Sequence, residues 1–154
     1  MFWIPLNLLL AFTTGFIVYN LALTLIGYFP QMKNTVFPVS FFTVLIIISK
    51  IIFRAPATLH TLLVVFFCAI CLYMFNSIDL LSSLIGALLG VTILTFASML
   101  LVYPLLQKIR INLTNNIRTW DWVMFNIGEL IIPFSVFIIL RIKKFSIKNI
   151  YYFK

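Results

Sequence analysis

The run "LLSSLIGALLGVTILTFASMLLVY", residues 80–103, decides the fold, because it contains no charged side chain. A helix needs about 20 apolar residues to cross the hydrocarbon core of a bilayer. Further apolar segments lie on either side of this run, at about residues 6–28, 36–53, 61–75 and 119–140. The sequence therefore predicts an all-α, polytopic integral membrane helical bundle with about five transmembrane helices.

The composition leads to the same conclusion. Of the 154 residues, 64% are hydrophobic and 9% are charged, whereas soluble domains are roughly 45–50% apolar and about 25% charged. The net charge of +8 comes from cations that lie between and after the apolar segments, where they meet lipid headgroups. We therefore expect the lipid bilayer as a partner, and not nucleic acid.

The predicted organisation is a single transmembrane helical domain, residues 1–140, followed by a basic and aromatic tail at the membrane surface, residues 141–154. The stretch "NSID" predicts a tight turn with Asn76, Ser77 and Asp79 as candidate helix caps. Counting cations by side gives six against five, which hardly separates the two orientations. The tail carries the densest group of cations, so we expect a cytoplasmic C-terminus in a bacterial plasma membrane.

Glu129 is the most conspicuous polar residue of the apolar segments. It is one of only 3 acidic residues and lies in "FNIGELIIPF", residues 125–134. On a helix, Asn126, Glu129 and Pro133 share one face, and Pro133 has no N–H to bond the carbonyl of Glu129. Ionisable groups at this depth face the bundle interior or a wet cavity and are candidates for function. The alternative is a structural Glu that ties helices together through hydrogen bonds.

Candidate partners of Glu129 lie on two other segments. Lys50 shares a helix face with Arg54, although its position near the helix end draws its side chain towards the headgroups. Asn20 and Thr24, in the first apolar segment, are the hydrogen-bonding alternatives. We therefore expect an intramembrane polar site made up of Glu129, Asn126, Lys50, Arg54, His60 and Asn20.

His60, Cys68 and Cys71 contain the elements of a nucleophile and its base. On one continuous helix, however, Cys68 lies about 12 Å beyond His60, and Cys71 about 16 Å beyond it. An interfacial His and two apolar Cys explain these residues better. Since no phosphate-binding loop, carboxylate pair or metal-ligand spacing accompanies them, the sequence predicts no catalytic residue, no cofactor and no metal.

Ser82, Gly86 and Gly90 recur every four residues in the long apolar run. Small residues at this spacing allow two helix backbones to approach closely. The pattern fits packing inside the bundle as well as it fits a homo-oligomer, and both alternatives stay open.

Three segments in order, "ALTLIGYFPQMK", "IIFRAPATLHTLL" and "LVYPLL", resemble a known family. Between residues 22 and 106 the chain is similar to the multi-span N-terminal region of certain sensor histidine kinases of spore-forming, low-GC bacteria. Arg54, Pro56, His60 and Thr61 match the loop pattern of that region. The resemblance implies a membrane-embedded input module.

Two features depart from that family. Ala97 and Ser98 stand where the family often has Gly-Glu, and the kinase portion is absent. The resemblance therefore implies a module that acts through a partner. Arg54, His60 and Cys68 also loosely resemble the membrane cysteine endopeptidases that mature quorum-sensing peptides, but "PATLH" lacks the Gly-Gly that precedes the histidine there.

The leading interpretation is a non-catalytic sensor-like or accessory subunit that acts through a protein partner or as a homo-oligomer. The alternative is a small transporter or channel component that uses Glu129 as a proton or cation site. Transporters commonly contain two matched broken helices. The sequence indicates one such break, at Pro133, and therefore favours the accessory interpretation.

Overall fold

A computed structural model describes residues 3–52, 57–102, 104 and 119–145, and every regular element within these ranges is helical. The elements are α1 (Trp3–Leu25), α2 (Met32–Ile52), α3 (Ala57–Asn76), α4 (Leu80–Ala97), the short π-helix η1 (Ser98–Val102) and α6 (Thr119–Ile142). The prediction of an all-α bundle is confirmed. The mixed polar segment 105–118 and the tail from residue 146 lie outside the described residues.

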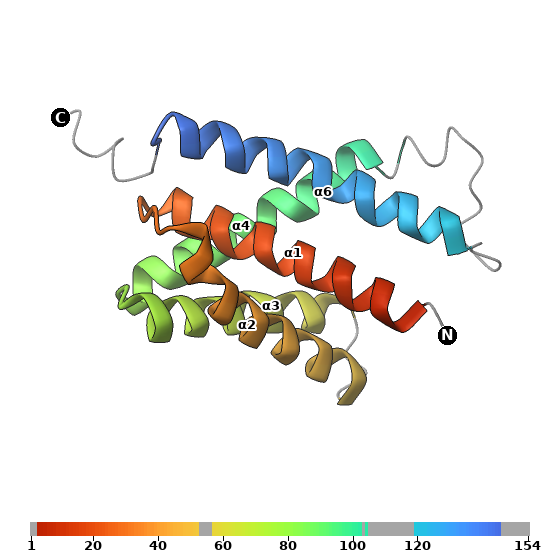
Figure 1. Cartoon of the computed structure of the whole chain (residues 1–154), viewed down its shortest axis with the longest axis horizontal. Helices are drawn as coiled ribbons and strands as arrows, with labels where there is room; N and C mark the ends of the chain where they lie inside the picture. Colours follow the sequence, from red (N-terminus) through yellow and green to blue (C-terminus); the bar gives the residue numbers. More distant parts are fainter. Residues whose placement is uncertain (1–2, 53–56, 103, 105–118, 146–154) are drawn as a thin grey trace.

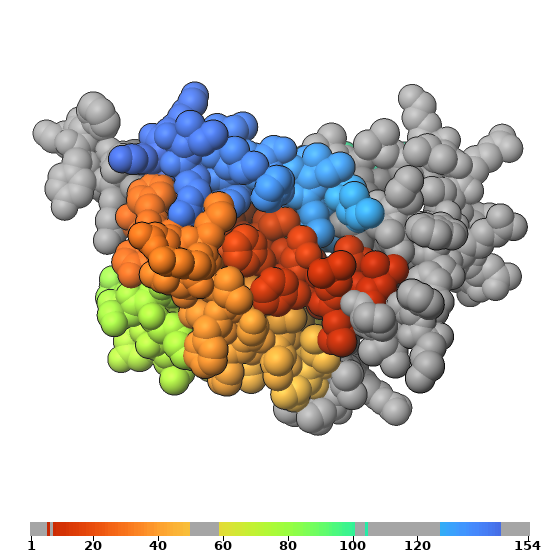
Figure 2. Space-filling view, in the orientation of Figure 1, coloured from red at the N-terminus to blue at the C-terminus, as the bar shows by residue number. Residues whose placement is uncertain are grey.

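The helices pack as an antiparallel bundle in which α1, α3 and α6 run in one direction and α2 and α4 in the other (Figure 1). Helix α1 is central, because it contacts α2, α4 and α6. In the space-filling view α1 lies between α6 and α2 on one face (Figure 2). The apolar window of α1 is 61% buried, compared with 28–33% for those of α2, α3 and α4. The other helices therefore expose most of their apolar surface, as a bundle surrounded by lipid does.

Four described helices are long and apolar enough to cross a membrane, with windows at residues 8–25, 32–49, 59–76 and 80–100. This supports a membrane-embedded protein. Helix α6 has 24 residues and is about 36 Å long at 1.5 Å per residue, which suffices for a fifth span. Its crossing of the bilayer stays a prediction.

The helix ends follow from local hydrogen bonding. At the end of α1, Tyr28 N donates to Leu23 O (2.9 Å) and Gly27 N to Thr24 O (3.0 Å), with Gly27 at a φ of 82°. This is a Schellman ending, in which glycine adopts the left-handed conformation without steric cost. The predicted cap Asp79 is confirmed, since its carboxylate accepts from Ser82 N at 2.8 Å.

The main apolar core fills the space between α1, α2, α3 and α4 and includes the buried side chains of Tyr19, Phe42, Cys68 and Leu72. A smaller cluster joins α6 to α1 and consists of Leu21, Leu25 and Phe137, with Leu89 and Ile93 of α4 packed against it. Helix α6 therefore packs outside the main core, against α1 and α4.

The glycines of α4 allow close contact with α1. A Cβ atom added to Gly86 would lie 2.8 Å from Ile26 Cγ2 and 3.1 Å from the carbonyl oxygen of Ala22, and one added to Gly90 would lie 3.1 Å from the carbonyl oxygen of Val18. The small residues thus pack inside the bundle, which is one of the two alternatives drawn from the sequence. Ser82, one turn before Gly86, is half-buried, and the adjacent Ser83 is fully buried.

Candidate polar site between α4 and α6

The end of α4 is irregular. After Ala97 the helix widens into the π-helix Ser98–Val102, and the N–H of Ser98 is shared between Leu94 O and Thr95 O. Short π segments inside helices frequently accompany functional sites, because they redirect backbone and side-chain groups. The sequence had predicted one continuous helix over residues 80–103. The structure corrects this, with the change occurring at a serine.

Glu129 lies half-buried against this irregular segment. The hydroxyl of Ser98 is hydrogen-bonded to Oε1 of Glu129, and Ser98 Oγ also lies 2.9 Å from Leu94 O. The carboxyl group therefore reaches across from α6 to the point where α4 becomes a π-helix. Like the bond between Tyr19 and Asn76, this contact joins side chains of two different helices.

The Ser98 hydroxyl has one proton to donate and two acceptors within reach, Leu94 O and Glu129. A serine hydroxyl carries one proton, so Ser98 donates either to Leu94 O or to Glu129, but not fully to both. If the carboxyl group carries a proton, Glu129 donates to Ser98 and Ser98 donates to Leu94 O. If the carboxyl group is ionised, it accepts the proton of Ser98, and Leu94 O loses that donor. Leu94 O and Glu129 thus compete for the single proton of the Ser98 hydroxyl.

Pro133 adds a second irregularity next to the same residue. It lies inside α6 and is buried. Because it lacks an N–H, it leaves the carbonyl of Glu129, one turn earlier, without its usual helical donor. Glu129 therefore has a carboxyl group that faces the π segment of α4 and a backbone carbonyl that lacks its usual helical donor.

The expected partners of Glu129 on α1 are wrong. Phe137 packs with Leu21 and Leu25, and α6 runs parallel to α1 (Figure 1). Glu129 precedes Phe137 by eight residues (137 − 129), so it lies roughly level with residues 13 to 17 of α1 (21 − 8 and 25 − 8). Asn20 and Thr24 lie further along the helix, by about 1.5 Å per residue.

Asn20 and Thr24 bond instead within α1. Asn20 Nδ2 donates to Phe16 O at 2.9 Å, and Thr24 Oγ1 donates to Asn20 O at 2.8 Å. Both side chains are fully buried, and Oδ1 of Asn20 has no hydrogen-bond partner. Asn20 is therefore a buried polar residue of the central helix rather than part of the Glu129 contact.

The remaining predicted site residues do not join this contact in the described part of the chain. The side chains of Asn126 and Lys50, and the whole of Arg54, lie outside the described residues. His60 is half-buried near the start of α3, at the same end of the bundle as the π segment. The predicted six-residue site is thus reduced, among the residues that can be placed, to Glu129 with a serine that was not among its candidates.

A second interhelical contact escaped sequence reasoning. The hydroxyl of Tyr19, on α1, is hydrogen-bonded to Oδ1 of Asn76 and lies 3.3 Å from Cys71 O, both at the end of α3. Tyr19 is completely buried. A tyrosine within an apolar run gave no sign of a partner, and Asn76 had been assigned only as a candidate cap.

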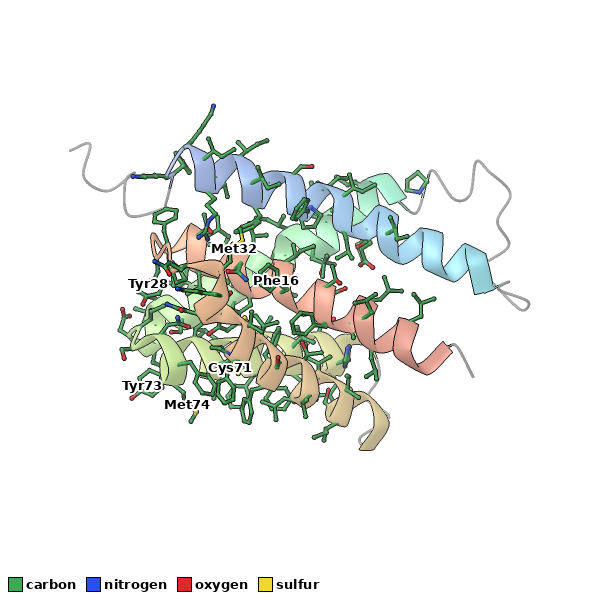
Figure 3. All side chains as sticks on the ribbon, viewed as in Figure 1. Phe16, Tyr28, Met32, Cys71, Tyr73 and Met74 are labelled. Atoms are coloured by element: carbon green, nitrogen blue, oxygen red, sulfur yellow. The ribbon has the colours of Figure 1, made fainter. Side chains whose placement is uncertain are left out.

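The cysteines lie in the core of the bundle. Cys68 and Cys71 are free thiols with no exposed surface, packed in the main apolar cluster. Figure 3 shows Cys71 pointing inward, whereas Tyr73 and Met74 on the same helix point outward. Such burial denies a peptide substrate access to either sulfur. Among the described residues, no group of three or more His, Cys, Asp or Glu is placed to hold a metal ion.

Comparison with known protein families, with curated proteins and with solved structures found no match to this chain.

Proposed function

We propose that this chain is a non-catalytic integral membrane subunit, sensor-like or accessory, that acts through a protein partner. The observation that carries the proposal is the contact between Glu129 and Ser98. It places the one acidic residue near the middle of α6 on the irregular end of α4. A change in its protonation or binding state would alter how α6 is held against the rest of the bundle.

The position of α6 outside the main core supports this role. Its described contacts are with α1, α4 and η1, and Phe137 is its one buried residue in the small apolar cluster that it forms with Leu21 and Leu25 of α1. A helix held by a small apolar cluster and a polar contact can change position at lower free-energy cost than one embedded in the main core. In a sensor-like subunit, such a helix would transmit the state of Glu129 to the partner.

The hydroxyl groups of the described helices support the non-transport interpretation. Thr13, Thr14, Thr92, Thr95 and Ser135 each donate to the carbonyl four residues earlier in their own helix. Hydroxyls satisfied in this way do not need a hydrated path. The resemblance to the membrane region of sensor histidine kinases points in the same direction, towards input without catalysis in this chain.

A small transporter or channel component is the second candidate, and one observation favours it. Two helix irregularities, the π segment at Ser98 and Pro133, lie beside a single carboxyl group. Broken helices that meet at an ionisable residue are typical of ion and proton sites in transporters. Glu129 would then bind a proton or a cation during transport.

The two candidates make opposite predictions for the purified protein. An accessory subunit, isolated from its native membrane in mild detergent, should remain in a complex of fixed stoichiometry with one partner through size-exclusion chromatography. Glu129→Gln should leave that complex intact but change the partner's activity. A transporter should instead move protons or cations in liposomes when it is the only protein present, and Glu129→Gln should abolish that flux. Flux by the isolated chain would overturn the accessory proposal.

Membrane topology has its own test. We propose that the C-terminus lies in the cytoplasm of a bacterial cell and that five spans separate it from the N-terminus. Reporter fusions at Lys154 and within residues 112–116 should report opposite sides of the membrane. If both fusions report the cytoplasm, the number of spans is wrong.

A further inference from the structure

One end of the bundle gathers cations from segments far apart in the sequence. We call it the Pro30 end and define it by residues 26–34, 76–80 and 140–145, where α1, α3 and α6 end and α2 and α4 begin. It carries Lys33 in the first turn of α2 and Arg141, Lys143 and Lys144 at the end of α6. Lys33, Lys143 and Lys144 are exposed.

Arg141 joins these two basic segments. Its Nη2 donates to Pro30 O at 2.5 Å, three residues before Lys33, and its guanidinium lies over the ring of Phe137 at 5.7 Å from the centroid. The first contact attaches α6 to the connection between α1 and α2. The second fixes the direction of the arginine side chain. Arg141 thus attaches the end of α6, which carries two lysines, to the connection that leads into Lys33.

The backbone at the end of α6 presents its lysines outward. Phe145 N donates to Leu140 O at 3.0 Å and Lys144 N to Arg141 O at 3.3 Å, with Lys144 at a φ of 48°. This is a Schellman ending like that of α1, but with lysine in place of glycine. Cations at a helix C-terminus also favour the negative end of the helix dipole. Lys143 and Lys144 are therefore held in a defined turn.

The charge at this end is unbalanced. Of the 3 acidic residues in the sequence, Asp79 alone lies at the Pro30 end, and its carboxylate caps α4. Asp121 and Glu129 precede Arg141 on α6 by 20 and 12 residues, or about 30 Å and 18 Å. Within the described residues, the side chains of Lys33 and Lys143 make no hydrogen bond or ion pair.

Apolar and aromatic side chains surround the cations. Figure 3 shows Tyr28 and Met32 at this end, and both are exposed, as are Phe29, Ile142 and Phe145. Aromatic and apolar groups interleaved with lysines suit the boundary between acyl chains and headgroups, where the rings contact lipid and the ammonium groups contact phosphate. A soluble acidic partner would not require this exposed apolar surface.

We propose that the Pro30 end binds the phosphate groups of anionic phospholipids through Lys33, Lys143 and Lys144, with Arg141 as the positioning residue. The bound headgroups would hold the end of α6 against the start of α2. Because basic juxtamembrane clusters are attracted to anionic cytoplasmic leaflets, the same contact favours a cytoplasmic location for this end. This inference requires that the chain lies in a membrane, but it does not require either proposed function of Glu129.

The test measures lipid binding by the intact protein. The full chain is purified in detergent, mixed with phosphatidylglycerol or with phosphatidylcholine of the same acyl chains, and examined by native mass spectrometry for bound lipid. We expect the wild type to bind phosphatidylglycerol preferentially. Each exposed lysine removed should weaken that binding by about fivefold, so K33Q/K143Q/K144Q should lose about a hundredfold.

A matched variant separates a local site from total charge. K50Q/K108Q/R118Q removes the same number of cations from other parts of the chain and should keep the preference to within about fivefold. Equal losses in the two triple variants would overturn the proposal, as would a wild type without preference for the anionic lipid. Displacement of the lipid by millimolar inorganic phosphate would assign the site to a soluble phosphate instead. Thermal unfolding of each variant in the same detergent confirms that the protein is folded.

Discussion

Helix α4 contacts α1 and α6 in two different ways. The contact with α1 depends on close backbone packing, whereas the contact with α6 includes a hydrogen bond between side chains. Against α1, Gly86 and Gly90 allow the two backbones to touch, and the atoms closest to these glycines are backbone atoms or apolar carbons. Against α6, a polar contact joins Ser98 to the carboxyl group of Glu129. The first interface should therefore be constant, whereas the second should respond to a ligand or partner that competes for the carboxyl group of Glu129.

The largest effect is expected from Gly90→Leu in the α1–α4 interface. The new side chain would meet the carbonyl oxygen of Val18 and the Cβ atom of Ala22, and neither backbone can yield without separating the helices. We expect destabilisation of about 3 kcal/mol or more, measured by chemical unfolding in bicelles. Thr92→Leu, at an exposed position of the same helix, is the control and should have little effect. Unchanged stability of Gly90→Leu would mean that α4 and α1 are not in contact.

Glu129→Leu should have the next largest effect. The substitution removes the partner of Ser98 across the α4–α6 contact, and the loss of such a partner costs about 1–3 kcal/mol when buried groups are left unsatisfied. Glu129→Gln keeps the shape and the hydrogen-bonding capacity but cannot ionise, so it should retain most of the stability. A glutamine variant as unstable as the leucine variant would indicate that the carboxyl group is needed for folding itself.

Much of the fold could be predicted from the sequence, because the bilayer imposes helix length directly. The segment 119–140 corresponds closely to α6 (Thr119–Ile142), since tryptophans begin it and cations end it. The start of α2 was predicted four residues late, at residue 36 instead of Met32. The polar residues of "FPQMKN" suggested that the connection continues to residue 36, whereas the helix begins within this stretch and includes Pro38.

The candidate site was only half predictable. Glu129 is conspicuous in any apolar run, so its importance could be inferred from its type and depth. Its partner could not, because Ser98 is separated from it by a connection whose path the sequence does not specify. The rotation and register of α6 against α4 depend on apolar packing, such as that of Phe137 with Leu21 and Leu25. Serines in membrane helices mostly bond to their own backbone, and Ser98 lies within reach of Leu94 O as well.

Ser98→Ala should have a smaller effect than the loss of the carboxyl group. It removes the hydroxyl from both Leu94 O and Glu129, but the N–H of Ser98 still bonds to Leu94 O. We expect a loss of about 1 kcal/mol, the typical net contribution of one hydrogen bond. Thr95→Ala removes a hydroxyl that bonds only within α4, to Val91 O, and is the matched control. If Thr95→Ala lowered the free energy of unfolding more than Ser98→Ala, the contact of Ser98 with α6 would not contribute to stability.

The smallest effect, and the most direct test of the comparison, is the coupling between Ser98 and Glu129. A double-mutant cycle of Ser98→Ala and Glu129→Gln isolates their interaction, because residues in contact deviate from additivity by about 0.5–3 kcal/mol while distant ones add. We expect a coupling near the lower limit, since glutamine still offers a carbonyl to the serine hydroxyl. The coupling should grow when Glu129→Leu replaces Glu129→Gln, because leucine offers no acceptor.

The same cycle between Gly90→Ala and Glu129→Gln should give additive effects, since Gly90 faces α1 and its close contacts contain no ionisable group. If Ser98 and Glu129 gave additive effects while Gly90 and Glu129 were coupled, the comparison would be wrong. The α1–α4 contact would then be the responsive interface, and the α4–α6 contact the constant one.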